Sequence, residues 1–281
     1  MLLFSFLVAG SFSLGGAAAN DLAPTALNAV RFGLASVIMA AFVYARGGMS
    51  REALKAPWRY LVLGGLFAVY FVLMFEGLKT APPVSAAAVF TLTPLMSAAF
   101  GYVLLRQVVD GRIALALSIG AVGAAWVIFR ADLLAVLAFE IGRGEAIYFV
   151  GCVAHAVYTP MVRVLNRGEP VLVFAFLTLV ACAGVITLWG IPEILAADWG
   201  GLRPIVWVAI GYTAVFASAA TVFLIQFASL RLPSSKVMAY TYLTPSWVIL
   251  WEVGLGQPIP GALVLVGVGL TVLALGLLLK D

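Results

Sequence analysis

Long apolar segments recur along the whole chain and limit its fold more than any other feature. A helix needs about 20 apolar residues to cross the hydrocarbon of a membrane, and windows of that length can be placed ten times. They lie near residues 2–19, 25–45, 58–78, 83–105, 111–129, 145–165, 170–190, 204–228, 234–254 and 258–279. This pattern predicts an all-α integral membrane protein with ten transmembrane helices.

Composition supports the same class. Hydrophobic residues make up 64% of the 281 residues and charged residues 10%, with a mean hydropathy of +1.13, whereas soluble domains average about 45–50% apolar and about 25% charged residues. Burying this much apolar surface takes lipid. The net charge of +4 comes from Lys and Arg scattered in short loops without a basic stripe, which argues against a nucleic-acid partner.

Few side chains could bind a metal or form a disulfide. The chain has one histidine and two cysteines, Cys152 and Cys182, which lie within apolar runs, and it has neither a CxxC nor an HExxH motif. We interpret the cysteines as small core residues, and we expect no metal site and no cofactor.

The first apolar segment has two interpretations. Ala17-Ala18-Ala19 after an apolar run resembles a signal-peptide cleavage site, but no charged residue precedes the run. The sequence that follows, LAPTALNAVRF, also aligns with GEPVLVFAFLT when Pro24 is set on Pro170, an offset of 146 residues. Because a removed signal would have no reason to match the middle of the chain, we expect a retained transmembrane span.

The chain also carries signs of an internal duplication. Leu-Thr-Pro occurs in FTLTPLM and again in TYLTPSW, so that Pro94 and Pro245 are 151 residues apart, as are Pro82 and Pro233. Five helices per half is an odd number, so the second half must enter the membrane from the opposite side. We therefore predict two inverted five-helix repeats, residues 1–129 and 145–281, joined by an outer connection at residues 130–144.

Positive charge predicts the orientation, because cytoplasmic loops carry an excess of Lys and Arg. With a cytoplasmic N-terminus, the outer loops hold four basic residues, Lys79, Arg130, Arg143 and Arg203. The inner loops and the C-terminus hold eleven, namely Arg46, Arg51, Lys55, Arg59, Arg106, Arg112, Arg163, Arg167, Arg231, Lys236 and Lys280. Both termini are therefore predicted to be cytoplasmic.

Inverted repeats are common in secondary transporters, where a pseudo-two-fold axis in the membrane plane lets one fold open to either side of a midplane site. A membrane enzyme is the main alternative class, but the sequence has no Walker A loop, no GxSxG motif and no paired catalytic carboxylates. A channel would need rings of charge or a carbonyl filter. A purely structural role leaves the duplication without an explanation.

Several stretches resemble the drug/metabolite transporter superfamily, in particular its EamA-type exporters with ten helices. The resemblance rests on the Arg31-Phe32 pair, on GLKTAPPVSAAAVFTLTPLMSAAFGYVLLRQ at residues 77–107 with its counterpart at 228–257, and on HAVYTPMVR at 155–163. Among members, the chain is most similar to bacterial exporters of aromatic amino acids, which also export the dication methyl viologen. The family commonly has a tryptophan where this chain has His155.

The resemblance implies a monomeric exporter of amino acids in the inner membrane of a bacterium, with small molecules and lipid as its partners. Drugs, organic cations and metabolites such as nucleotide sugars are the alternative substrates. The resemblance also implies a mechanism of alternating access around a cavity between the repeats.

The two Leu-Thr-Pro prolines are candidate hinges. A proline inside a helix frees the carbonyl four residues back, which here belongs to Phe90 for Pro94 and to Thr241 for Pro245. In lipid each freed carbonyl must find a partner. A packing kink and a hinge beside the substrate are both consistent with this pattern.

Aromatic and hydroxyl side chains surround these prolines and suit a planar apolar solute, or a cation held over ring faces. Helical periodicity puts Tyr240 and Thr244 on one face and Tyr242 with Pro245 on another. The candidate binding residues near the kinks are Phe90, Thr93, Tyr240, Thr241, Tyr242 and Thr244.

Ionisable residues in the spans complete the candidates. His155 lies about ten residues into the sixth span with Tyr158 one turn later, and an ionisable group inside a bilayer is a site candidate by default, a hydrogen-bonded packing histidine being the alternative. Glu76 and Glu252 lie toward the outer ends of the third and ninth spans and are candidates for gating or coupling, or for solvation at the interface. No span holds a mid-helix carboxylate pair, which weakens obligatory proton or sodium antiport.

Overall fold

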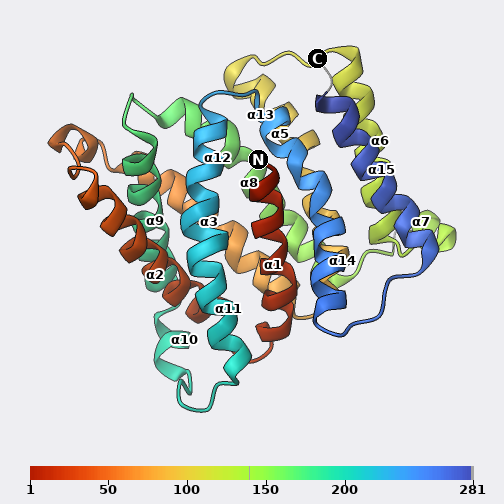
Figure 1. Ribbon diagram of the computed structural model, residues 1–281, viewed down its shortest axis with the longest axis horizontal. Coiled ribbons are helices and arrows are strands. Elements are labelled where there is room, and N and C mark those ends of the chain that lie inside the picture. Colours follow the sequence, from red (N-terminus) through yellow and green to blue (C-terminus); the bar gives the residue numbers. More distant parts are fainter. Residues whose placement is uncertain (139, 280–281) are drawn as a thin grey trace.

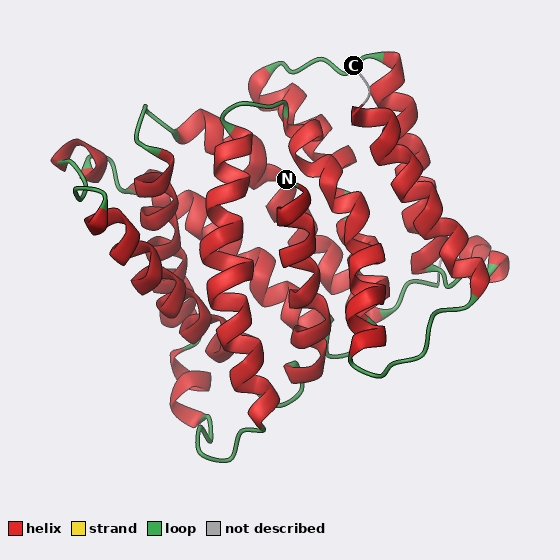
Figure 2. Cartoon of the chain, viewed as in Figure 1, coloured by secondary structure: helices red, strands yellow, loops and turns green. Residues whose placement is uncertain are grey.

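The computed structural model describes residues 1–138 and 140–279, which form a bundle of helices without a strand (Figures 1 and 2). The first half of the chain contains α1 Leu2–Ala18, α2 Pro24–Ala45, the short η1 Arg51–Leu54, α3 Trp58–Gly77, α4 Pro83–Phe90, α5 Thr93–Leu105 and α6 Gly111–Ile128.

The second half begins after a short helix, α7 Leu133–Ala138, which lies inside the predicted connection at 130–144. It contains α8 Arg143–Leu165, α9 Val171–Trp189, α10 Ile191–Ala196, α11 Pro204–Ala214, the π-helical η2 Val215–Ala220, α12 Thr221–Ser229, α13 Ser234–Ala239, the 3-10 turn η3 Tyr240–Leu243, α14 Thr244–Gly254 and α15 Ala262–Leu279. The last helix thus begins four residues after the predicted start near residue 258.

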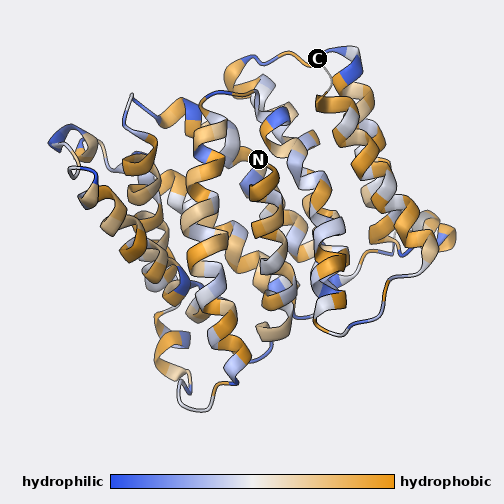
Figure 3. Ribbon diagram, viewed as in Figure 1, coloured by the Kyte–Doolittle hydropathy of each residue, from blue (hydrophilic) through white to orange (hydrophobic). Residues whose placement is uncertain are grey.

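Within the described residues, eight helical segments are long and apolar enough to cross a membrane, one of them α4 together with α5, and α1 is a shorter apolar helix. The ninth apolar segment is divided among α13, η3 and α14, so no single helix there spans the full width. Apolar residues dominate the bodies of the helices, and hydrophilic residues gather near their ends and in the loops (Figure 3). The prediction of an all-helical, multi-span membrane protein is confirmed.

Each half surrounds the first helix of the other half. Helix α1 packs against α11 and α14 of the second half, and α8 packs against α3 and α5 of the first half. The pairs α2 with α9 and α6 with α15 lie at opposite sides of the molecule (Figure 1). The centre of the bundle is therefore built by both halves.

Small residues bring the paired helices close together. A methyl group added at Gly123 of α6 would lie 2.7 Å from the carbonyl oxygen of Gly267 in α15, and one at Gly64 of α3 would lie 2.6 Å from the backbone nitrogen of Cys182 in α9. Association of helices in a membrane depends on such close packing, because lipid offers no hydrophobic drive between them. These glycines allow α6 to pack closely against α15, and α3 against α9.

Candidate functional site

Both Leu-Thr-Pro sequences break a helix, and each freed carbonyl has a partner. Helix α4 ends at Phe90, whose carbonyl oxygen accepts a hydrogen bond of 2.6 Å from the Thr93 hydroxyl. At the second break, the carbonyl oxygen of Thr241 accepts from the backbone N–H of Thr244 within the 3-10 turn. The chain thus compensates for Pro94 with a hydroxyl and for Pro245 with a tighter helical turn.

The two breaks meet inside the bundle. The hydroxyl oxygens of Thr93 and Thr241 lie 3.5 Å apart although the residues are 148 positions apart in sequence, and both side chains are fully buried. The contact joins the α4–α5 break of the first half to the α13–α14 break of the second half. The predicted hinge segments are therefore neighbours.

A small cavity of about 20 Å³ lies beside Phe90, between α1, α3, α8 and the η2–α12 segment. Its walls include Phe67, Tyr70, Phe71 and His155. A cavity of this size has room for about one water molecule. The centre of the bundle is closed in this conformation.

His155 lies in a cage of aromatic rings. Its ring centroid is 4.4 Å from that of Tyr70, 5.3 Å from Phe90, 5.7 Å from Phe67 and 6.1 Å from Tyr158. The side chain is 3% exposed, and its Nδ1 has no hydrogen-bond partner among the described residues. A buried polar atom left without a partner is costly, so this nitrogen is available to a molecule that enters the cavity.

Tyr158 supports one wall of this cage. Its ring stacks on Phe67 with centroids 3.8 Å apart, and its hydroxyl accepts a hydrogen bond of 2.8 Å from Nε2 of Gln226 in α12. The same amide nitrogen donates to the hydroxyl of Thr178 in α9 at 3.1 Å. Sequence reasoning missed Gln226, although an amide in the middle of an apolar helix is itself a signal of a buried hydrogen-bond network.

The other predicted residues lie away from the cavity. Tyr242 packs on Gly120 of α6 and belongs to a separate cluster with α15, whereas Thr244 is buried and Tyr240 half-buried near the second break. Glu76 pairs with Lys79 at 2.6 Å at the end of α3, and Glu252 is half-buried near the end of α14. The structure thus brings together Phe90, His155 and Tyr158, with Thr93 and Thr241 joined beside Phe90.

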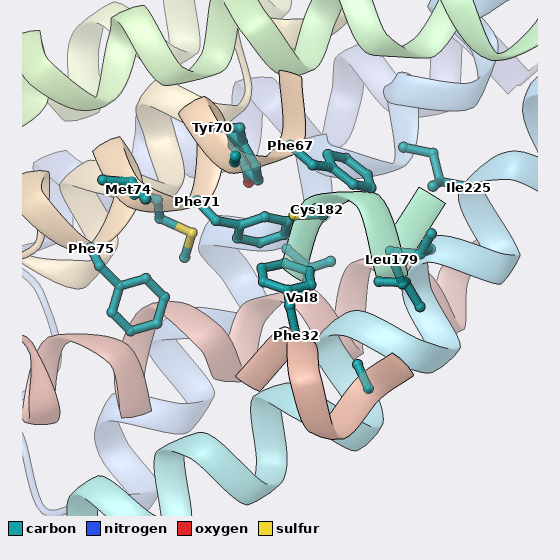
Figure 4. Packing of buried hydrophobic residues seen from close by; sticks show 14 of the residues in the cluster. Val8, Phe32, Phe67, Tyr70, Phe71, Met74, Phe75, Leu179, Cys182 and Ile225 are labelled. Carbon is teal, nitrogen blue, oxygen red and sulfur yellow. The ribbon is translucent and has the colours of Figure 1, made fainter. Parts of the chain in front are cut away.

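Arg31 is a second residue whose importance the sequence did not reveal. Its guanidinium in α2 is fully buried, and it donates from Nη2 to the Ala217 carbonyl at 2.7 Å and from Nε to the Ser218 hydroxyl at 2.7 Å. It also lies over the Phe71 ring, with Cζ 4.2 Å from the centroid. In Figure 4 the Phe71 ring lies between the rings of Tyr70 and Phe32. In the sequence, Arg31 stood out only as a single cation inside an apolar span and as part of the Arg31-Phe32 pair.

An ion pair joins the two halves at one end of the bundle. Arg59, at the start of α3, binds Glu169 in the α8–α9 loop with Nη2 and Oε1 2.6 Å apart, and its Nη1 donates to the Leu165 carbonyl at 2.7 Å. The side chains are 1% and 8% exposed. Although partial burial raises the pKa of Glu169, the hydrogen bonds from Arg59 and from the Arg167 backbone N–H hold it below its ordinary value.

A second ion pair at the opposite end has the same construction. Arg203, directly before α11, binds Asp21 in the α1–α2 loop with Nη2 and Oδ2 2.5 Å apart, and Nη2 also donates to the Ala17 carbonyl at 2.9 Å. Here the side chains are 63% and 22% exposed. Each pair therefore links the start of the third long helix of one half to the first loop of the other half, and only the first pair is buried.

Comparisons with known proteins agree with this architecture. The EamA-like transporter family matches residues 1–129 and 142–280. The curated protein described as uncharacterized transporter YyaM of Bacillus subtilis (strain 168) is 26% identical over 266 residues, which cover 92% of this chain and 86% of that protein. A solved crystal structure superposes with a TM-score of 0.75 at 22% identity, over 98% of this chain and 94% of its own; at that identity the likeness concerns the fold alone.

Proposed function

Because this chain belongs to the EamA-like transporter family, we propose that it is a secondary transporter which exports small organic solutes by alternating access. A transporter of this family is a multi-pass membrane protein with a small-molecule substrate and a lipid environment. We propose further that the solutes are amino acids, aromatic ones among them, and that the protein acts as a monomer in the bacterial inner membrane with both termini cytoplasmic.

One observation carries this proposal: the two broken helices, one from each half, meet at the Thr93–Thr241 contact beside a closed aromatic cavity. Broken helices that meet at a repeat interface are the usual location of transporter sites. The same hydroxyl contact would have to loosen for either half to tilt against the other. We therefore take Pro94 and Pro245 as hinges and the cavity at His155 as the closed form of the binding site.

The packing of the halves supports two inverted repeats, residues 1–129 and 145–281. Helix α1 has the neighbours α11 and α14, and α8 has the corresponding neighbours α3 and α5. The ion pairs Arg59–Glu169 and Arg203–Asp21 are likewise corresponding contacts at opposite ends. A two-fold relation of this kind lets each pair close one face, so that breaking either one opens the centre to that face alone.

The aromatic cage supports the choice of substrate. Four rings surround His155, and its free Nδ1 can accept a hydrogen bond from an ammonium group or an indole N–H. Aromatic walls with few polar groups fit a planar solute. Organic cations, which bind to ring faces, are the second candidate substrates, supported by the same cage. Glu76, paired with Lys79, and Glu252 stay as candidates for gating or coupling.

A flux assay in proteoliposomes tests the proposed function. The purified protein should move labelled tryptophan or phenylalanine with saturable kinetics, and unlabelled aromatic amino acids should compete. Flux that rises linearly with concentration would identify a channel, and conversion of the solute into a product would identify a membrane enzyme, the alternative class. Either result would contradict the proposal.

Replacing the hinge prolines is expected to slow transport. Pro94→Ala or Pro245→Ala restores a backbone donor for the freed carbonyl and straightens the wall. We expect the initial rate to fall about tenfold, which corresponds to ~1.4 kcal/mol in the rate-limiting step, while the protein still inserts. The matched control is Pro204→Ala: Pro204 also occupies the first turn of its helix, but it follows a loop, whereas Pro94 and Pro245 follow helical segments whose carbonyls they leave free. Rates equal to the parent in both hinge variants would favour a plain packing kink.

The orientation has its own test. Ten membrane-crossing segments place both ends of the chain on one face, and the charge bias assigns that face to the cytoplasm, although Lys280 lies outside the described residues. A reporter that is active only in the cytoplasm, fused at the C-terminus or inserted between α2 and α3, should be active. A reporter inserted between α10 and α11 should be silent, and the reverse pattern would invert the proposed topology.

A further inference from the structure

We propose that Arg31 binds an anionic group of the transported solute, so that the solute must carry a carboxylate or an equivalent negative charge. This inference rests on the proposed transport function and deepens it, because the aromatic cage alone does not distinguish an amino acid from an organic cation. It starts from a charge that the fold leaves uncompensated.

The guanidinium of Arg31 has no acidic partner in residues 1–138 and 140–279. The ion pairs of this part of the chain join Lys55 to Glu52, Arg59 to Glu169, Lys79 to Glu76 and Arg203 to Asp21. Arg31 donates instead to three neutral oxygens, those of Ala217, Ser218 and Asn28, the last at 3.3 Å. A guanidinium has five N–H groups, so it keeps capacity for another acceptor.

Charges inside a membrane are expensive unless they are paired, and for this reason they mark substrate pathways. The cost at Arg31 is reduced by the Phe71 face and by the neutral oxygens, but none of these contacts cancels the charge. An anionic solute would do so. The bound state would then contain an ion pair in surroundings of low dielectric, where such pairs bind strongly only with good geometry.

Arg31 lies one layer of side chains away from the cavity. Phe71 and Ala217 both contact its guanidinium, and both line the cavity. The cavity itself, about 20 Å³, is too small for an amino acid, so a solute can enter only when this wall moves. The wall that has to move is the one that covers Arg31.

The backbone on the far side of this wall is also irregular. Residues Val215–Ala220 form a π-helical segment, and Arg31 binds two of its members, Ala217 and Ser218. Single π-helical turns are frequent at functional sites, and here the Ala217 carbonyl of this segment accepts from Arg31. The corresponding helix of the first half, α3, is a regular α-helix throughout.

The other half of the chain has no equivalent of Arg31. With Pro24 set on Pro170, Arg31 falls on Leu177 of α9. A cation needed only to hold the bundle together would be expected in both halves, since α2 and α9 occupy corresponding positions. Arg31 and the π-helical segment instead distinguish one side of the centre from the other, as recognition of an asymmetric solute requires.

The first test uses the parent protein and solutes that differ in charge. Four solutes are compared: tryptophan, indole-3-propionate with only the carboxylate, tryptamine with only the ammonium, and methyl viologen. Each is tested as a competitor of labelled tryptophan in transport. Each is also tested, separately, as a ligand that raises the unfolding temperature of the detergent-solubilised protein. We expect the two carboxylates to act at concentrations at least about tenfold lower than the two cations, as a charge-assisted hydrogen bond predicts. Tryptamine or methyl viologen acting as well as tryptophan would overturn the proposal.

The two measurements separate this inference from the proposed function. Saturable transport with equal competition by tryptamine would keep the function and remove the role of Arg31. If only the carboxylate solutes raise the unfolding temperature and no solute is transported, the Arg31 site is supported and the proposed transport function is contradicted. An absence of both competition and stabilisation by carboxylates would overturn the inference.

The second test replaces Arg31 itself. Arg31→Gln should reduce the preference for tryptophan over tryptamine about tenfold, and Arg31→Lys should retain part of that preference, because the lysine keeps the charge but not the planar fork. Ser218→Ala is the matched control: it removes one contact of the guanidinium and leaves its charge. A merely structural role predicts that tryptophan and tryptamine binding fall together in every variant, and that result would overturn the assignment.

Discussion

Replacing Glu169 by glutamine is expected to open the face of the protein at which Arg59 lies. The substitution keeps the size of the side chain but leaves Arg59, which is 1% exposed, without a negative partner. Removing one member of a buried pair costs about 3 kcal/mol. We therefore expect a clearly lower unfolding temperature and a shift of the conformational equilibrium toward the form that is open at this end.

Cys152 and Cys182, both fully buried and free, provide the measurement. In Glu169→Gln, a membrane-impermeant thiol reagent applied from the side at which Arg59 lies, the cytoplasmic side in the proposed orientation, should label the protein several-fold faster than in the parent. The matched control is Asp21→Asn at the opposite end, where the partner Arg203 is 63% exposed and water replaces the lost contact. This control should leave the unfolding temperature nearly unchanged and increase labelling only from the outer side.

Acid should have the same effect as Glu169→Gln. The pKa of Glu169 lies below its ordinary value in the folded protein because of the bonds from Arg59 and Arg167, so the ion pair stabilises the closed form above the ordinary glutamate pKa of about 4.3. This stability is lost as the pH falls through the lowered folded value. Equal labelling of parent and Glu169→Gln at neutral pH would show that the pair does not hold this face closed.

Replacing His155 by alanine is expected to have the largest effect on transport. The imidazole contacts four aromatic rings, and such ring pairs contribute about 0.5–1.5 kcal/mol each. Losing them removes the shape of the cavity wall together with the Nδ1 acceptor. We expect kcat/KM for tryptophan to fall about a hundredfold, which corresponds to ~2.7 kcal/mol, at unchanged membrane expression.

His155→Trp separates shape from polarity. Tryptophan keeps an aromatic ring in the cage and is the commoner residue in the exporters that this chain resembles, but it donates a hydrogen bond and accepts none. We expect transport of tryptophan, threonine and methyl viologen to change in relative order more than the unfolding temperature changes. If parent, alanine and tryptophan forms transport all three solutes at the same relative rates, His155 is a packing residue.

The positions of the helices could be predicted because hydrophobicity and proline act locally. An apolar window of fixed length defines a span, and Pro94 and Pro245 predicted both helix breaks at the right residues. Even the partner of one freed carbonyl could be anticipated, since a hydroxyl at Thr93 lies within reach of Phe90. These conclusions needed no knowledge of distant contacts.

The faces of the broken helix could not be predicted in the same way. The pairing of Tyr242 with Pro245 assumed the α-helical rotation of about 100° per residue, whereas the 3-10 turn at Tyr240–Leu243 rotates about 120° per residue. Each residue of such a turn adds about 20° to the rotation, so faces counted with α-helical periodicity do not carry over from Tyr240 and Tyr242 to Thr244 and Pro245. In the structure the ring of Tyr242 packs on Gly120 of α6 and does not line the cavity.

Contacts between the halves were also invisible in the sequence. Arg59 counted only as one of eleven inner charges, and its partner Glu169 lies 110 residues later. The acceptors of Arg31 depend on a π-helical segment that no proline or glycine marks, since its sequence is VFASAA. Burial and pairing of charges thus depended on the tertiary structure, which hydropathy does not describe.

The unequal exposure of the two ion pairs predicts that dissolved salt acts on one face of the protein only. High salt weakens an exposed ion pair and acts much less on a buried one. With cytoplasmic termini, the exposed Arg203–Asp21 pair faces the external medium, and the buried Arg59–Glu169 pair faces the cell interior. If the two pairs close the outer and inner faces of the exporter as proposed, a rise in external salinity would loosen the outer closure while the inner one holds, and the ionic strength outside the cell would adjust the rate of export.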